Sequence, residues 1–159
     1  DAGQNQITGT IPKEISNASA LATLFLDNNQ ITGTIPPEFG TSHLISFSIA
    51  INQITGSIPT EIGQVSTLKY LDLSNNQLSG NIPSSFSNLN QLTTLHLNNN
   101  QLSGTVPSGL SNATNLSTLT LGDKSEATVM IAVLTRKNWL VRAVGKWEIL
   151  TRPSASGAM

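Results

Sequence analysis

Cysteine is absent from this chain of 159 residues, and only 11% of the residues are charged. Without cysteine, neither disulfide bonds nor thiolate metal sites contribute to stability. The longest uninterrupted apolar run, residues 129–134, is far shorter than the ~20 residues that cross a bilayer, and no charged-then-apolar leader opens the chain. We therefore expect no transmembrane segment, and a surface covered mainly by neutral hydrogen-bonding side chains.

Basic charge is scarce in the first three quarters of the chain. Residues 1–123 hold two lysines against seven acidic residues, a net charge of −5, whereas residues 124–159 hold six basic against two acidic residues, a net charge of +4. A nucleic-acid-binding region needs a basic patch or stripe. We therefore expect no nucleic acid among the partners of the longer region.

What the chain does contain is a leucine-and-asparagine frame that recurs with almost no drift. Successive copies are offset by 23 or 24 residues, which indicates one supersecondary unit that is stacked repeatedly and buries its apolar edge against the next copy. The four complete copies begin Leu21-x-x-Leu24-x-Leu26-x-x-Asn29, Leu44-x-x-Phe47-x-Ile49-x-x-Asn52, Leu68-x-x-Leu71-x-Leu73-x-x-Asn76 and Leu92-x-x-Leu95-x-Leu97-x-x-Asn100.

In the first half of each copy, buried and exposed side chains alternate, which is the period of a short strand with one solvent-facing side. Stacked copies would align these strands in a parallel sheet. The asparagine at the ninth position can donate and accept hydrogen bonds toward backbone groups that are unpaired where the chain leaves the strand. We expect these asparagines, Asn29, Asn52, Asn76 and Asn100, to form an internal ladder.

The second half of each copy is equally regular and contains a Thr/Ser-Gly-x-Ile/Val-Pro segment, within residues 6–12, 30–36, 53–59, 77–83 and 101–107. The glycine permits a tight bend or a close backbone approach, and the proline ends any extended pairing. The residues after the proline are too few for an α-helix, so we expect single 3₁₀ turns that place one apolar side chain in the core.

These motifs resemble the plant-type leucine-rich repeat family, whose pattern is LxxLxLxxNxLxGxIPxxLxxLxx, from residue 5 to about residue 123. The resemblance implies an α/β-type leucine-rich repeat solenoid over residues 1–123, with a concave parallel sheet, a second short strand in each copy, and 3₁₀ turns on the convex side. Three departures stand out. The paired cysteines that cap plant ectodomains are missing, the second copy is one residue short near Thr41, and Lys124 takes the asparagine position of the sixth copy.

Residues 124–159 form a basic, non-repeat tail that holds both tryptophans of the chain. Three of its segments are rich in β-branched and aromatic residues and predict strands or a strand and a helix: 127–135, 139–144 and 147–151. Because a terminal repeat exposes an apolar end, we interpret the tail as its cap. A basic membrane-binding or partner-binding element is the alternative.

Few titratable groups converge in this sequence, and catalysis requires such groups. We place His43 on a convex turn and His96 on the concave sheet, one repeat from Asp72, where the two side chains could form a hydrogen-bonded pair. That pair lacks an activated nucleophile, an oxyanion donor and a pocket, and the other carboxylates recur singly without a metal-binding constellation. We therefore expect no enzymatic activity, no cofactor and no metal.

The remaining candidate is the concave surface. Phe25 and Tyr70 are aromatic side chains exposed among small polar groups, and such residues can anchor a partner. The resemblance to receptor-like ectodomains and wall-associated inhibitors implies a non-enzymatic recognition module, secreted or at the cell surface, that binds a protein, peptide or glycan. The candidate contact residues are Phe25, Asp27, Tyr70, Asp72, His96 and Asn98.

Two other functions stay open. Hydroxyl-rich side chains of the second strands would stack in two parallel columns, and rigid threonine arrays bind ice or crystalline polysaccharide, as antifreeze proteins of the same repeat family imply. The column residues are Thr8, Thr10, Thr32, Thr34, Thr55, Ser57, Ser79, Asn81, Ser103 and Thr105. These residues also match the consensus of the repeat subclass, which explains their recurrence without ice binding. The third possibility is a structural component of an extracellular assembly, in which the C-terminal tail or an open repeat end joins neighbouring copies.

Three glycosylation sequons begin at Asn17, Asn112 and Asn115. All three fall on expected convex turns or at the exits of these turns. They favour an extracellular, eukaryotic origin, although an Asn-rich and Ser-rich chain produces such matches by chance.

Overall fold

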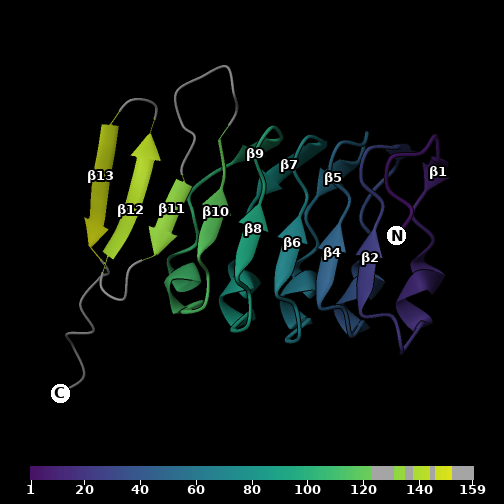
Figure 1. Ribbon diagram of the computed structural model, residues 1–159, viewed down its shortest axis with the longest axis horizontal. Helices are drawn as coiled ribbons and strands as arrows, with labels where there is room; N and C mark the ends of the chain where they lie inside the picture. The colour runs from purple at the N-terminus through teal and green to yellow at the C-terminus, as the bar shows by residue number, and fades with distance from the viewer. Residues whose placement is uncertain (123–130, 135–137, 144–145, 152–159) are drawn as a thin grey trace.

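The computed structural model describes residues 1–122, 131–134, 138–143 and 146–151 of the chain. The repeats lie side by side along one long axis, each with a short strand and a 3₁₀ turn at its base (Figure 1). The helices of this described part are short 3₁₀ turns, and it contains no α-helix. None of these helices is long and apolar enough to cross a membrane.

The front sheet is formed by the Leu-x-x-Leu-x-Leu segments, whose strands run parallel in the order of the repeats. The five strands are β2 (Thr23–Phe25), β4 (Ser46–Ser48), β6 (Tyr70–Asp72), β8 (Thr94–His96) and β10 (Thr118–Thr120). Their register follows the repeat, so the equivalent apolar residues lie side by side: Leu24, Phe47, Leu71, Leu95 and Leu119. The predicted solenoid of stacked parallel strands is confirmed.

The Thr/Ser-Gly-x-Ile/Val segments form a second set of short parallel strands, which pair as β1–β3 and as β5–β7–β9. These strands are β1 (Thr8–Thr10), β3 (Gln30–Thr32), β5 (Thr55–Ser57), β7 (Gln77–Asn81) and β9 (Gln101–Ser103). Their glycines have a positive φ; at Gly33, φ is 81° and a Cβ atom would lie 2.8 Å from Cγ2 of Thr10. Both the backbone angle and the close approach therefore require glycine there.

A 3₁₀ turn follows the proline of each copy, as predicted. The turns are η1 (Lys13–Asn17), η2 (Pro37–Thr41), η3 (Thr60–Gln64), η4 (Ser84–Asn88) and η5 (Ser108–Asn112). From η2 onward, each turn buries one apolar side chain: Phe39, Ile62, Phe86 and Leu110. The ring of Phe39 stacks on Phe47 of the front sheet, with centroids 5.1 Å apart.

The core lies between the front sheet, the second strands and the turns. Leu71, Leu73 and their equivalents in the next copy are fully buried, and each such burial contributes roughly 1.5–3 kcal/mol. Leu24 and Leu26 are only partly buried, because the truncated first copy covers the second one incompletely. The leucines of the second copy are therefore less completely buried than their equivalents in the later copies.

The predicted asparagine ladder is confirmed, and Asn76 shows how it works. Its amide nitrogen donates to three backbone carbonyl oxygens at 3.0–3.2 Å, one of which belongs to Ile49 in the preceding copy. Its Oδ1 accepts from the backbone nitrogen of Ile54, 3.0 Å away in the same preceding copy. The same arrangement recurs at Asn29, Asn52 and Asn100. Each asparagine thus links two neighbouring copies.

The residue before each ladder asparagine has a left-handed backbone, and so does Gln4, which precedes Asn5 at the equivalent position of the truncated first copy. Four of these five residues have an amide side chain: Gln4, Asn28, Asn75 and Asn99. The fifth is Ile51, with φ of 55° and an exposed fraction of 52%. A β-branched residue is poorly suited to this backbone region, so Ile51 is both strained and exposed.

The second copy is one residue short, and the change falls at the end of η2. Ser42 follows this turn with ψ of 163°, whereas the corresponding residues of the other copies have ψ of 63–83°. The Oγ atom of Ser42 is buried and has no hydrogen-bond partner among the described residues. The missing residue therefore changes the backbone after this turn and leaves the Oγ atom of Ser42 unpaired.

After β10 the chain changes from parallel to antiparallel pairing. Strands β11 (Ile131–Leu134), β12 (Asn138–Ala143) and β13 (Lys146–Thr151) form a three-stranded antiparallel sheet. Strand β11 lies next to β10 at the end of the front sheet (Figure 1). The predicted strands of the tail are therefore present, Lys124 lies outside the described residues, and the capping role of the tail stays a prediction.

Candidate recognition face

One side of the front sheet carries the side chains that alternate with the buried leucines, and we call this surface the polar face. It consists of Thr23, Phe25, Asp27, Ser46, Ser48, Ala50, Tyr70, Asp72, Ser74, Thr94, His96, Asn98, Thr118, Thr120 and Gly122. All six predicted contact residues belong to this face, and all six are half-buried. Their role in binding stays a prediction.

Three rings line up across the polar face. Tyr70 meets Phe25 edge to face, with centroids 6.2 Å apart and an interplanar angle of 77°, and it meets His96 at 6.1 Å and 73°. Phe25 and Tyr70 come from β2 and β6, and they meet across β4 because this strand carries only Ser46 and Ser48 on the same side. Edge-to-face geometry is favourable for aromatic rings, so the row is ordered before any partner arrives.

The carboxylate of Asp27 lies beside this row and is held by the next strand. Its Oδ1 accepts a hydrogen bond from Oγ of Ser48 and another from the backbone nitrogen of Ala50, 3.1 Å away. Because Ser48 is the lateral neighbour of Asp72 in the sheet, the two carboxylates occupy one region of the polar face.

The carboxylate of Asp72 is bonded to residues of its own copy, within β6 and directly after it. Its Oδ1 accepts from the backbone nitrogen of Ser74 at 2.9 Å, and its Oδ2 accepts from the Tyr70 hydroxyl at 3.2 Å. Burial raises the pKa of Tyr70 to about 12, and the negative charges of Asp72 and Asp27 add to the increase. The tyrosine therefore remains a neutral hydrogen-bond donor at physiological pH.

The predicted hydrogen-bonded pair of His96 and Asp72 does not form. Although the two residues are lateral neighbours, Nδ1 of His96 lies 2.8 Å from Oγ1 of Thr120 on the other side. The Thr120 hydroxyl donates its proton to Oδ1 of Asn98 at 2.6 Å, so Nδ1 must be the donor toward Thr120. This hydrogen-bond pattern leaves Nε2 of a neutral His96 as an acceptor.

Asp72, His96 and Asn98 line a shallow hollow of about 400 Å³ on the polar face, together with Ser74, Asn99 and Thr120. Asn99 was not predicted as part of a site. Its position directly before a ladder asparagine, in the row of left-handed residues, was the signal that could have identified it. In the described part of the chain, no group of three or more His, Cys, Asp or Glu residues is placed to hold a metal ion.

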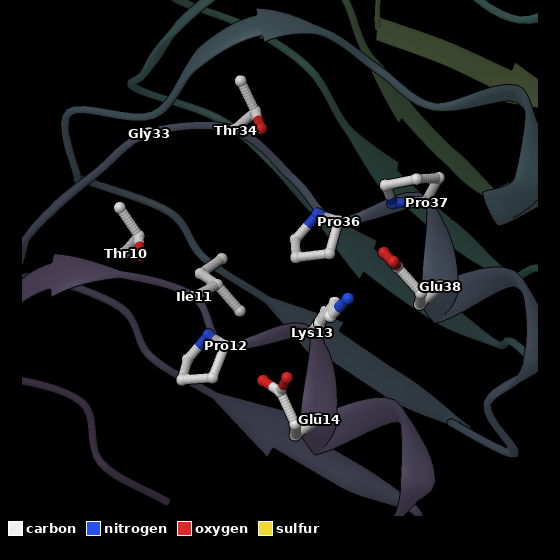
Figure 2. A pocket seen from close by; sticks show the side chains of 10 residues that line it. All are labelled: Thr10, Ile11, Pro12, Lys13, Glu14, Gly33, Thr34, Pro36, Pro37 and Glu38. Atoms are coloured by element: carbon white, nitrogen blue, oxygen red, sulfur yellow. The ribbon is translucent and has the colours of Figure 1, made fainter.

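A second hollow, of about 680 Å³, was not predicted from the sequence. Figure 2 shows it between the first two copies, where Pro12 and Pro36 lie beside Ile11 and where Glu14 and Glu38 stand at the start of their turns. The sequence signal is the unique Pro-Pro pair at residues 36–37, which places Pro37 at the first position of η2. This hollow lies away from the polar face.

The hydroxyl columns differ from the expected arrangement. Thr10 is paired with Thr32 and Ser57 with Ser79, so neighbouring copies are shifted by two residues and the columns run diagonally. In addition, the hydroxyl of Thr32 donates to the carbonyl oxygen of the glycine in the preceding copy at 3.1 Å, and Thr55 does the same at 3.1 Å. Part of the array is therefore already hydrogen-bonded within the protein.

The sequons lie on the turns. Asn17 is the last residue of η1 and is exposed, and Asn112 is the last residue of η5. Asn115 is also exposed, but its amide nitrogen donates to the carbonyl oxygen of Asn90 at 2.7 Å. Glycosylation at any of the three stays a prediction.

Sequence models of the leucine rich repeat match most of the repeat region: one matches residues 42–102 and 66–123, and another matches residues 20–42. No curated protein matches the chain significantly. The matched residues extend over more than half of the chain and coincide with the copies that carry the polar face.

Several solved structures are similar to this chain. The ectodomain of the receptor kinase GASSHO1/SCHENGEN3 from Arabidopsis thaliana, in complex with CASPARIAN STRIP INTEGRITY FACTOR 2, is 39% identical with a TM-score of 0.73, over 75% of this chain and 14% of that one. The Arabidopsis receptor kinase HAESA, in complex with the peptide hormone IDA and the co-receptor SERK1, is 40% identical with a TM-score of 0.72. This match covers 74% of the present chain and 20% of the matched chain.

A match to the Arabidopsis thaliana BIR3–SERK2 complex has 37% identity and a TM-score of 0.63, and it covers 69% of this chain and 60% of the matched chain. The present chain therefore spans only about a fifth or less of the two receptor kinase chains, but more than half of the shorter one.

Proposed function

This chain belongs to the plant-type leucine-rich repeat family, and on that basis we propose that it is a non-enzymatic module that recognises a protein or peptide partner through its polar face. The observation that carries the proposal is the aromatic row of Phe25, Tyr70 and His96 beside a hollow lined by polar groups. Preordered aromatic anchors cost little entropy on binding, and interface energy concentrates in such residues.

The similar structures support the same class of function. Two of them are receptor kinases in complex with a peptide hormone or an integrity factor, and the third is a complex between two proteins. Because this chain corresponds to only part of those receptors, its own partner is a proposal, and so is an extracellular location, secreted or at the cell surface. The exposed sequon at Asn17 is consistent with that location.

The alternative surfaces have weaker support. A threonine array for ice or crystalline polysaccharide needs hydroxyl groups in regular columns, and here the columns run diagonally and some hydroxyls bond the preceding copy. Self-assembly through the tail or an open repeat end, and binding of a glycan, have no specific observation in their favour.

The test is a selection of random linear peptides displayed on phage against the 159-residue chain. Selected peptides would be synthesised, and their dissociation constants measured for the wild type and for a Phe25→Ala, Tyr70→Ala double variant. Because each anchor contributes roughly 1 kcal/mol or more, we expect the double variant to bind at least about tenfold more weakly.

A matched control removes exposed apolar side chains elsewhere. Ile7 and Val106 are exposed to 38% and 36% and lie outside the polar face. An Ile7→Ala, Val106→Ala double variant should bind like the wild type. Equal binding by the wild type and the Phe25→Ala, Tyr70→Ala variant, with circular dichroism showing that both are folded, would refute the assignment of this face.

A further inference from the structure

We propose that the partner segment that docks on the polar face is basic, and that an Arg or Lys side chain of this segment seats beside Tyr70 between the carboxylates of Asp27 and Asp72. This inference rests on the proposed function and names the chemistry of its ligand. It follows from the charges of the face, the positions of the two carboxylates, the aromatic row and the acceptors that line the hollow.

The charge of the polar face has one sign. Asp27 and Asp72 are its charged residues, and neither has an ion-pair partner among the described residues. Lys69 directly precedes β6 and is exposed, but it makes no ion pair with either carboxylate. The whole region of residues 1–123 has a net charge of −5. A complementary partner therefore contributes positive charge.

The two carboxylates converge on one spot. Asp27 is tied to Ser48, and Ser48 lies directly beside Asp72 in the sheet. Both carboxylates also act on the same tyrosine, since both contribute to the raised pKa of Tyr70. Oδ2 of Asp27 accepts no hydrogen bond from a described residue, so it is available to a ligand.

The aromatic row gives this spot a second means of holding a cation. A guanidinium or ammonium group within ~6 Å of a tyrosine ring centre is attracted to the ring, and the attraction grows as water is excluded. Tyr70 is fixed from both sides by Phe25 and His96, so its ring does not have to be ordered on binding. The planar guanidinium of Arg also stacks on aromatic rings.

The hollow next to Tyr70 offers acceptors to a donor-rich group. The carboxylate of Asp72 lines it, and so does His96, whose Nε2 is an acceptor when the ring is neutral. An Arg side chain has five N–H donors and a Lys side chain has three. Such a side chain could therefore bond the carboxylate and the imidazole at once.

The test uses the peptides selected on phage. We expect Arg and Lys to be enriched in the selected pool relative to the starting library. In a synthetic peptide, Arg replaced by citrulline, or Lys by acetyl-lysine, should weaken binding at least about fivefold, because each replacement removes the charge and keeps the shape.

A double-mutant cycle then locates the contact. Asp72→Asn should weaken binding of the basic peptide about fivefold, and the citrulline peptide should bind the Asp72→Asn variant and the wild type nearly equally, because the two changes remove the same interaction. If the Asp72→Asn variant does not fold, the Asp27→Asn variant replaces it in the same cycle. Glu38→Gln, on the far turn η2, is the matched control and should change nothing.

The outcomes separate the two proposals. Selected peptides that contain no excess of Arg or Lys, or citrulline peptides that bind the wild type as tightly as the parent peptides, would overturn the basic ligand while leaving recognition by the polar face intact. If every selected peptide binds the Phe25→Ala, Tyr70→Ala variant as tightly as the wild type, the proposed function is overturned, and the basic ligand with it.

Discussion

Asn76→Ala is the sharpest perturbation of this fold, because one side chain makes four hydrogen-bond contacts, of which those to Ile49 and Ile54 join two copies. Its amide makes three donor contacts at 3.0–3.2 Å and its Oδ1 accepts at 3.0 Å, and the residue is only 9% exposed. A buried hydrogen bond contributes about 1 kcal/mol, and the substitution leaves the backbone nitrogen of Ile54 without its side-chain acceptor. The carbonyl oxygens of Ile49 and Leu73 each keep a hydrogen bond from a neighbouring ladder asparagine. We therefore expect a loss of about 3–4 kcal/mol, a large share of the ~5–15 kcal/mol that stabilises a typical domain.

The assay is urea unfolding followed by circular dichroism, with the free energy of unfolding and its denaturant dependence fitted separately. Asn29→Ala provides a graded comparison, since Asn29 makes equivalent bonds at the less buried end of the solenoid and should cost about 1–2 kcal/mol. Asn88→Ala, on the exposed end of η4, should stay within about 0.5 kcal/mol of the wild type. A cost below about 1 kcal/mol for Asn76→Ala would refute the reasoning that the ladder holds the copies together.

Three further predictions concern single residues. Tyr70 is the only tyrosine of the chain, so the absorbance of tyrosinate reports its titration directly; ionisation should be centred near pH 12, and Asp72→Asn should lower that midpoint. Because the unfolded chain loses this proton near its ordinary pKa of about 10 while the folded chain keeps it, stability should be unaffected below pH 10 and should fall between about pH 10 and 12; a midpoint at the ordinary value would contradict the burial of the hydroxyl. Ile51→Asn should raise the free energy of unfolding by about 1 kcal/mol in urea titrations, because Asn suits the left-handed backbone; a loss of stability would show that Ile51 is not strained. Gly63→Ala should lower the unfolding temperature and cost about 1–3 kcal/mol, since a Cβ atom there would lie 2.5 Å from the carbonyl oxygen of Ser85; unchanged stability would mean that η3 and η4 separate freely.

The stacking of the copies could be predicted because every relevant position is repeated several times. A leucine at a fixed offset in each copy determines both the strand and its buried side, and an asparagine that recurs among leucines has few roles other than bonding the backbone. The front sheet, the ladder at Asn76 and the turns that bury Phe39 and Phe86 follow from these rules.

The details of the surface could not be predicted in the same way. The two-residue shift that pairs Thr10 with Thr32 depends on how the glycine bends each second strand, and the repeat length alone does not contain this information. His96 has a hydrogen-bonding neighbour on either side, Asp72 and Thr120, and the choice between them depends on a side-chain rotamer. The sequence therefore located the residues of the polar face but not their pairing.

The most direct test of recognition by the polar face is a chemical-shift map of the isotopically labelled chain, titrated with one peptide selected on phage. We predict that the largest shift changes fall on Phe25, Tyr70, His96 and their neighbours in β2, β6 and β8. Changes that instead concentrate on the turns η1 to η5, or on the hollow beside Pro12 and Pro36, would contradict the assignment of this surface as the binding site.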